Sequence, residues 1–111
     1  MLPSLSEDDA LDLGALVTAT ARERGLPVAV EVRRCGRVLY RAALPGTTPD
    51  NDDWLARKAR VVERYGRSTL AVRVGFEARG TTFEDATGLS PLEYAAHGGG
   101  FPLAVEGTGV V

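Results

Sequence analysis

The sequence predicts a mixed fold in which helices accompany a β-hairpin, and two patterns indicate it. Residues 7–24 carry apolar side chains at helical spacing, whereas residues 28–43 alternate in the manner of strands. The chain has 111 residues, 44% hydrophobic and 25% charged, which is ordinary for a globular protein. That length is enough for one domain with a core of its own, so we expect a single domain over residues 1–111.

The first helix is predicted at about residues 7–24, with signals at both ends. Ser6 is a favourable N-cap, and the acidic residues at positions 7, 8 and 9 suit the positive end of the helix dipole. Gly25 is a natural C-cap and Pro27 lies just beyond it, so the helix is expected to end there.

A hairpin follows, because two alternating runs flank a turn signal. Residues 28–33 and 37–43 alternate, and Cys35-Gly36 lies where the chain must reverse. Pro45-Gly46 ends the second strand.

A second helix is predicted from Asp50, again with an acidic N-terminus. It carries a stripe of arginines at positions 57, 60, 64 and 67, three or four residues apart. Such a stripe can grip carboxylates or phosphates, or it can be a solvated face.

The last third of the chain is less clear. Residues 68–79 alternate like a strand, yet Ser68 and Gly80 are good caps for a short helix, so both structures stay open. Ser90 and Pro91 can begin a helical turn that the glycines at 98–100 would end. Alternation from Phe101 to Val105 predicts a final strand.

Composition restricts the partners and the compartment. A net charge of -2 argues against nucleic acid, because affinity for a polyanion depends on Lys and Arg. No apolar run approaches the ~20 residues of a membrane span, and the acidic N-terminus is unlike a signal peptide. Cys35 is the only cysteine, so no intramolecular disulfide can form, and we expect a cytoplasmic protein.

No metal site is predicted. One histidine and one cysteine cannot supply the four ligands of structural zinc. Asp50 to Asp53 resembles a calcium loop, but Trp54 stands where an EF-hand needs an oxygen ligand. Cys35 lies among arginines that favour a thiolate, yet its place at a hairpin turn favours an incidental cysteine.

His97, the only histidine, has several possible roles. It can ligate a metal or haem iron, act as a general base, or cap the end of a helix. The glycines that follow can bring backbone N–H groups to a ligand or simply end the helix.

Three blocks of the sequence resemble a known family. They are PGTTPDNDDWLARK (45–58), Ser68-Thr69 and YAAHGGGFP (94–102), and the likeness covers essentially the whole chain. The sequence is similar to the uncharacterised UPF0303 family, within the HbpS-like, haem-degrading-domain superfamily.

The resemblance implies an α+β, profilin-like fold, in which an antiparallel sheet of about five strands has helices on its faces. It implies homo-oligomers, and it favours a helix at 68–79. Members of the family continue with another strand, an Asp-His pair and a final helix. We therefore expect residues 1–111 to be a single HbpS-like domain that lacks that strand and helix.

The resemblance supports three functional hypotheses. As a structural or interaction protein, the chain would form an oligomer through the motif residues Asn51, Trp54 and Phe101. As a binding protein for haem or a similar cofactor, it would use an axial His97. In that case Arg57 and Lys58 would lie near the propionates, and Gly98 and Gly99 against the flat ligand. As an enzyme on a small metabolite at a subunit interface, it would use His97 as acid or base.

Overall fold

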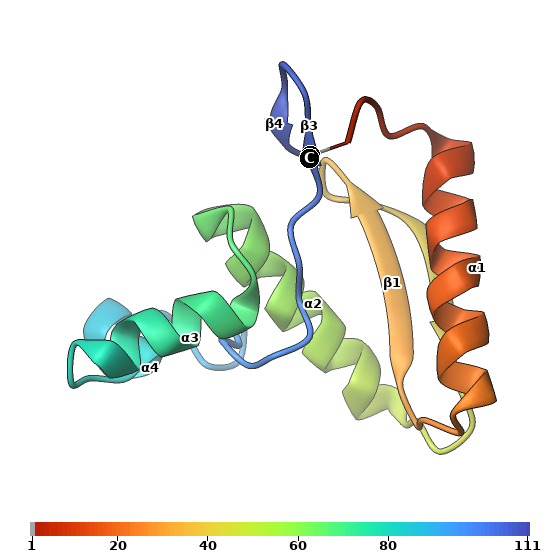
Figure 1. Cartoon of the computed structure of the whole chain (residues 1–111). Coiled ribbons are helices and arrows are strands. Elements are labelled where there is room, and N and C mark those ends of the chain that lie inside the picture. The colour runs from red at the N-terminus through yellow and green to blue at the C-terminus, as the bar shows by residue number, and fades with distance from the viewer. Residues whose placement is uncertain (1) are drawn as a thin grey trace. The chain divides into compact units, whose positions relative to one another are not determined.

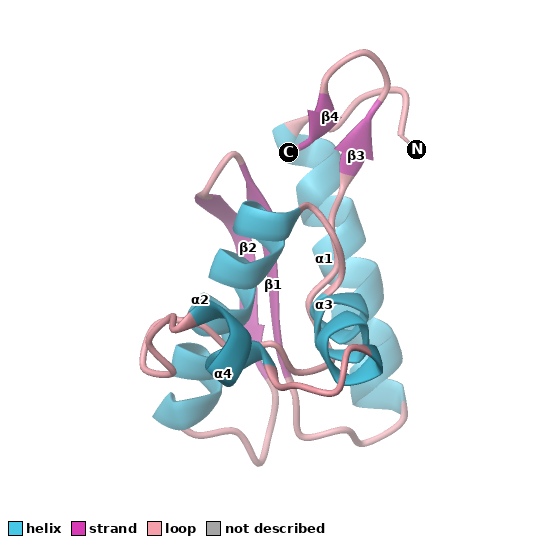
Figure 2. Cartoon of the chain, turned by 90° about the vertical axis from the view of Figure 1, so that its left-hand side faces the viewer, coloured by secondary structure: helices cyan, strands magenta, loops and turns pink. Residues whose placement is uncertain are grey.

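The computed structural model describes residues 2–111 and confirms an α+β fold with a small antiparallel sheet (Figures 1 and 2). The chain forms two compact units, one comprising residues up to Leu55 together with Leu103–Val111, the other comprising Ala56–Pro102. The elements in order are α1 (Glu7–Glu23), β1 (Ala29–Arg34), β2 (Arg37–Ala43), α2 (Pro49–Tyr65), α3 (Thr69–Ala78), α4 (Phe83–Thr87), β3 (Ala104–Val105) and β4 (Gly109–Val110).

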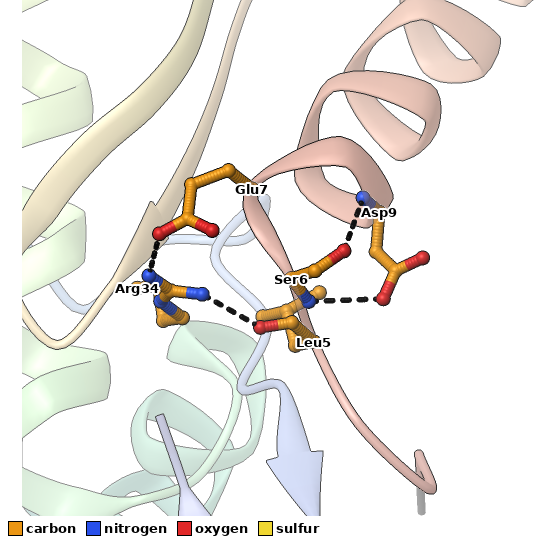
Figure 3. Close-up of polar contacts among 5 residues, drawn as sticks. All are labelled: Leu5, Ser6, Glu7, Asp9 and Arg34. Carbon is orange, nitrogen blue, oxygen red and sulfur yellow. Dashed lines mark hydrogen bonds and ion pairs between the residues drawn. The ribbon is translucent and has the colours of Figure 1, made fainter.

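The first helix has the predicted ends. The Ser6 hydroxyl accepts a hydrogen bond from the Asp9 amide at 3.0 Å, and the Ser6 amide donates to the Asp9 carboxylate at 2.9 Å. This reciprocal capping box is drawn in Figure 3. At the other end Arg24 is the C-cap, and Gly25 follows with a φ of 65°, a left-handed conformation that glycine adopts without strain.

The predicted hairpin is confirmed, with β1 and β2 paired antiparallel. Cys35 and Gly36 form the turn, with φ angles of 51° and 81°. Two positive φ angles are what a two-residue type I′ turn requires, and its twist matches the twist of the strands. The register shifts between Val32 and Arg33, because Leu39 of β2 is an extra residue without a partner in β1, so the bulge lies in β2.

Helix α1 packs along this hairpin (Figure 1). Its buried residues are small (Ala10, Gly14 and Ala21), so helix and sheet approach closely. A Cβ on Gly14 would stand 2.2 Å from Cγ of Tyr40 in β2. The Tyr40 hydroxyl donates to Thr18 Oγ1 at 2.7 Å, which holds the ring beneath the helix.

Arg34 ties the end of β1 to the start of α1 (Figure 3). Its guanidinium donates to the Leu5 carbonyl at 2.9 Å and forms an ion pair with Glu7. The hydrogen bond from Arg34 is the main reason why the pKa of Glu7 lies below its ordinary value.

The strand predicted from Phe101 is shorter than expected. Only Ala104–Val105 forms β3, which pairs with β4 across a turn where Gly107 has a φ of 75°. Pro102 cannot donate a backbone hydrogen bond, so a ladder cannot run through it. The Leu2 amide donates to the Ala104 carbonyl at 2.8 Å and joins the N-terminal segment to β3.

In the second unit, residues 68–79 form a helix rather than a strand. The Ser68 hydroxyl accepts from the Ala71 amide at 3.1 Å, and Gly80 follows the C-cap with a φ of 77°. Both predicted caps are therefore present. Val72 is fully buried, while Leu70 and Val74 are exposed, so the alternating residues lie on different sides of one helix.

The short helix α4 was not predicted. Thr82 caps it by accepting from the Asp85 amide at 3.2 Å, and Gly88 ends it with a φ of 67°. Phe83, its first residue, is buried in a cluster with Val61, Val72 and Ala96. Its ring makes edge-on contacts with Tyr65 and Phe76, at centroid distances of 6.0 and 5.8 Å. No helix within residues 2–111 combines the length and the apolar character that crossing a membrane requires.

Candidate functional site

The glycine tract is anchored at Gly100 by a pair of hydrogen bonds to the start of α3. The Gly100 amide donates to Thr69 Oγ1, and the Thr69 amide donates to the Gly100 carbonyl, both at 3.0 Å. Thr69 is fully buried. A Cβ on Gly100 would lie 2.7 Å from Thr69 Cγ2 and 3.1 Å from Val62 Cγ2, so only glycine fits here without a shift.

Lys58 lies beside the middle of the tract. Its Nζ is 3.2 Å from the point where a Cβ on Gly99 would stand, and Gly99 has a φ of 117°. Gly98 is exposed, and a Cβ there would meet no atom within 4 Å. The structure therefore brings Lys58 and Gly99 together, two of the residues that the sequence singled out for ligand binding.

The arginine stripe of α2 holds the segment that leads to His97. Nη1 of Arg57 donates to the Pro91 carbonyl at 2.9 Å, and Nη1 of Arg60 donates to the Glu93 carbonyl at 3.0 Å. The Ala95 amide donates back to the Arg57 carbonyl at 3.3 Å. These arginines thus satisfy backbone carbonyls, a role that neither sequence interpretation of the stripe included.

His97 lines a pocket of about 120 Å³ in the second unit. The pocket is bounded by α3, by the start of α4 and by the segment before the glycines. Its lining residues are Arg73, Glu77, Thr82, Phe83, Glu84, Ala96 and His97. The residues from α3 and α4 were not predicted from the sequence. Arg73 and Glu77 share a helix face only if 68–79 is helical, and that choice was open.

The pocket is lined partly by apolar residues and partly by charged residues. Phe83 and Ala96 are buried and supply the apolar part. Nε of Arg73 donates to Oε1 of Glu77 at 2.9 Å, an ion pair across one helical turn. Glu84 adds a second carboxylate, so the charged groups sum to a net negative wall.

The remaining motif residues lie elsewhere. Asn51 and Trp54 belong to the first unit, at the N-terminal end of α2. Oδ1 of Asn51 accepts from the Thr48 amide at 2.9 Å, so Asn51 helps to cap its own helix. Trp54 is 37% exposed, and Phe101, next to the anchored Gly100, is 73% exposed.

The pocket beside His97 does not fit haem. Its volume of about 120 Å³ is well below the ~300–1,000 Å³ of typical sites for drug-sized ligands. Among residues 2–111, no group of three or more His, Cys, Asp or Glu side chains is arranged to hold a metal ion.

Comparison with known proteins identifies relatives along nearly the whole chain. A UPF0303 protein of Streptomyces avermitilis is 57% identical over 110 residues, which cover 99% of this chain and 68% of the relative. A UPF0303 protein of Paraburkholderia xenovorans is 41% identical over 111 residues, which cover all of this chain and 67% of the relative.

A solved structure has the same fold. The crystal structure of Ybr137w protein matches with a TM-score of 0.82 and 30% identity, over 95% of this chain and 62% of that chain. This chain thus spans about two thirds of the length of its curated relatives and less than two thirds of the solved one. The family described as "Haem degrading protein HbpS-like" matches residues 5–111, and the chain belongs to this HbpS-like family.

Proposed function

We propose that the protein is a self-associating structural or interaction protein of the cytoplasm, and that Phe101 anchors the contact between its subunits. The observation that carries this proposal is the 73% exposure of Phe101, next to Gly100, whose backbone is hydrogen-bonded to Thr69. Leaving a phenylalanine ring in water forgoes about 1.5–3 kcal/mol of burial free energy. Burial against a second subunit would recover it.

The backbone beside Phe101 is hydrogen-bonded within its own unit. The two hydrogen bonds between Gly100 and Thr69 hold the tract against α3. Little conformational freedom is then lost when the ring enters a pocket, which is the property of an interface anchor. An aromatic side chain on a mobile loop would lose more conformational entropy on binding and would therefore contribute less to the association free energy.

Helix α3 adds apolar surface in the same unit. Leu70 and Val74 lie one helical turn apart and are both about half exposed. Leu70 directly follows Thr69, to which Gly100 is bonded. Exposed apolar residues that gather in one part of a molecule often mark protein–protein contacts. Trp54, which is also partly exposed, is the second anchor that the motif blocks offer.

Size-exclusion chromatography of Phe101→Ala tests the proposal. We expect this variant to elute later than the wild type at equal concentration, because truncating a central aromatic anchor typically costs more than about 2 kcal/mol of association free energy. Leu92→Ala is the matched control, since Leu92 is 81% exposed but lies outside the three motif blocks. Equal elution of Phe101→Ala and the wild type would remove the support for Phe101 as the anchor.

The cofactor and enzyme hypotheses have less support. The pocket at His97 does not suit haem, and Arg57 is engaged with the Pro91 carbonyl. His97 does share a concave surface with carboxylates, which favours a small ligand as the second candidate.

A further inference from the structure

We propose that the pocket beside His97 binds a small zwitterion, a molecule of amino-acid size that carries both a carboxylate and an ammonium group. This inference is independent of self-association. It rests on the size of the pocket, on the two opposite charges that it offers and on its apolar floor.

Arg73 supplies the group that would bind the carboxylate. Its Nε is engaged by Glu77 at 2.9 Å, which orients the guanidinium. No hydrogen bond within residues 2–111 uses its terminal nitrogens, so the Nη1 and Nη2 N–H groups are available as a planar pair of donors. This is the geometry with which arginine binds carboxylates bidentately.

Glu84 supplies the group that would bind the ammonium. It lies in the first turn of α4, and no hydrogen bond or ion pair within the described part of the chain engages its carboxylate. Glu77 is already paired with Arg73, so Glu84 is the carboxylate that a ligand can neutralise. His97 adds an imidazole that can donate or accept a hydrogen bond.

The size of the pocket restricts the ligand to a few non-hydrogen atoms. At about 120 Å³ the pocket has less than half of the ~300 Å³ at which sites for drug-sized ligands begin. A nucleotide or a tetrapyrrole is too large. Phe83 and Ala96, both buried, offer apolar surface for a short hydrocarbon part between the two charged ends.

Proton NMR offers a direct test, because the chain has one histidine and its ring resonances need no assignment among several. We would titrate the full chain with glycine and L-alanine, and separately with acetate and methylamine, which each carry one of the two charges. We expect a saturable shift of the His97 ring protons with the amino acids. Each half-ligand should bind at least tenfold more weakly.

Variants test which side chain binds the carboxylate of the ligand and which binds its ammonium group. Arg73→Gln and Glu84→Gln should each weaken glycine binding at least tenfold, whereas Arg67→Gln and Glu93→Gln, which change exposed residues outside the pocket, should leave it unchanged. Circular dichroism would verify that every variant is folded, and all four altered side chains lie at the surface. The proposal is overturned if the amino acids give no saturable shift, if the half-ligands bind equally well, or if the pocket variants bind like the controls.

Discussion

Gly98 and Gly100 are only two positions apart, yet their surroundings differ completely. A Cβ on Gly100 would press on Thr69 and Val62, whereas a Cβ on Gly98 would meet open space. The sequence GGG does not distinguish them. The difference arises because Thr69, 31 positions earlier, bonds to Gly100 from the start of α3.

This difference predicts unequal effects of alanine. Gly100→Ala should lower the free energy of unfolding by about 1–3 kcal/mol, the usual cost of overpacking a tight site. Gly98→Ala should change it by less than about 0.5 kcal/mol, as exposed substitutions usually do. Urea unfolding of both variants measures the contrast, and equal losses would contradict the anchoring of the tract at Gly100.

At this scale the sequence singles out the glycine tract, but it does not give the contacts of that tract. His97, Gly99 and Lys58 were singled out, and the structure places Lys58 against Gly99. That His97 shares a pocket with Arg73 and Glu84 could not be foreseen, because it depends on how α3 and α4 pack.

At the scale of elements, close packing of α1 on the hairpin depends on a glycine. Gly14 lies directly over the Tyr40 ring. Glycine has a low helix propensity, but here it allows the backbone of α1 to approach β2 closely. Gly75, in the middle of α3, gains nothing comparable, because a Cβ added there would meet no atom within 4 Å.

Alanine at these two helical glycines should therefore have opposite effects. Gly14→Ala should destabilise the protein by about 1–3 kcal/mol, because the overlap with Tyr40 outweighs the better helix propensity. Gly75→Ala should stabilise it by about 1 kcal/mol, the propensity difference alone. Thermal or urea unfolding gives both values, and a stabilising Gly14→Ala would mean that α1 does not lie so close to Tyr40.

The tie between α1 and β1 should make stability depend on pH. Because Arg34 lowers the pKa of Glu7 in the folded protein, the unfolded chain binds more protons near pH 4. The stabilising effect is complete above the ordinary value of 4.5 and is lost as the pH falls through the lowered pKa. Arg34→Gln should flatten this acid dependence in urea unfolding, while Arg22→Gln should retain it. Equal slopes in both variants would contradict the role of Arg34.

The elements themselves were largely predictable, because most of them have local signals. Caps and periodicity located α1, the hairpin and α2. Helix α4 was missed although Thr82 and Asp85 carry a capping signal, since five residues are too few for periodicity to show. The open choice at 68–79 arose because Leu70 and Val74 are apolar but exposed, so the pattern imitated a strand.

At the scale of the whole molecule, the feature that bears on function is the set of apolar side chains exposed to solvent. The exposed apolar residues include Phe101, Leu70 and Val74. Of these three, Phe101 belongs to one of the sequence blocks that resemble the family. The sequence predicted that Phe101 would be an interface residue, through resemblance rather than through pattern. Periodicity in a single chain reports burial within that chain and does not report a contact with a second chain.

Native mass spectrometry of the wild-type protein at several concentrations, with Phe101→Ala beside it, is the most direct measurement. We expect one dominant oligomeric mass for the wild type, a multiple of the 11.8 kDa chain, and a shift towards the monomer for Phe101→Ala. A wild type that is monomeric at every concentration would contradict self-association through this surface.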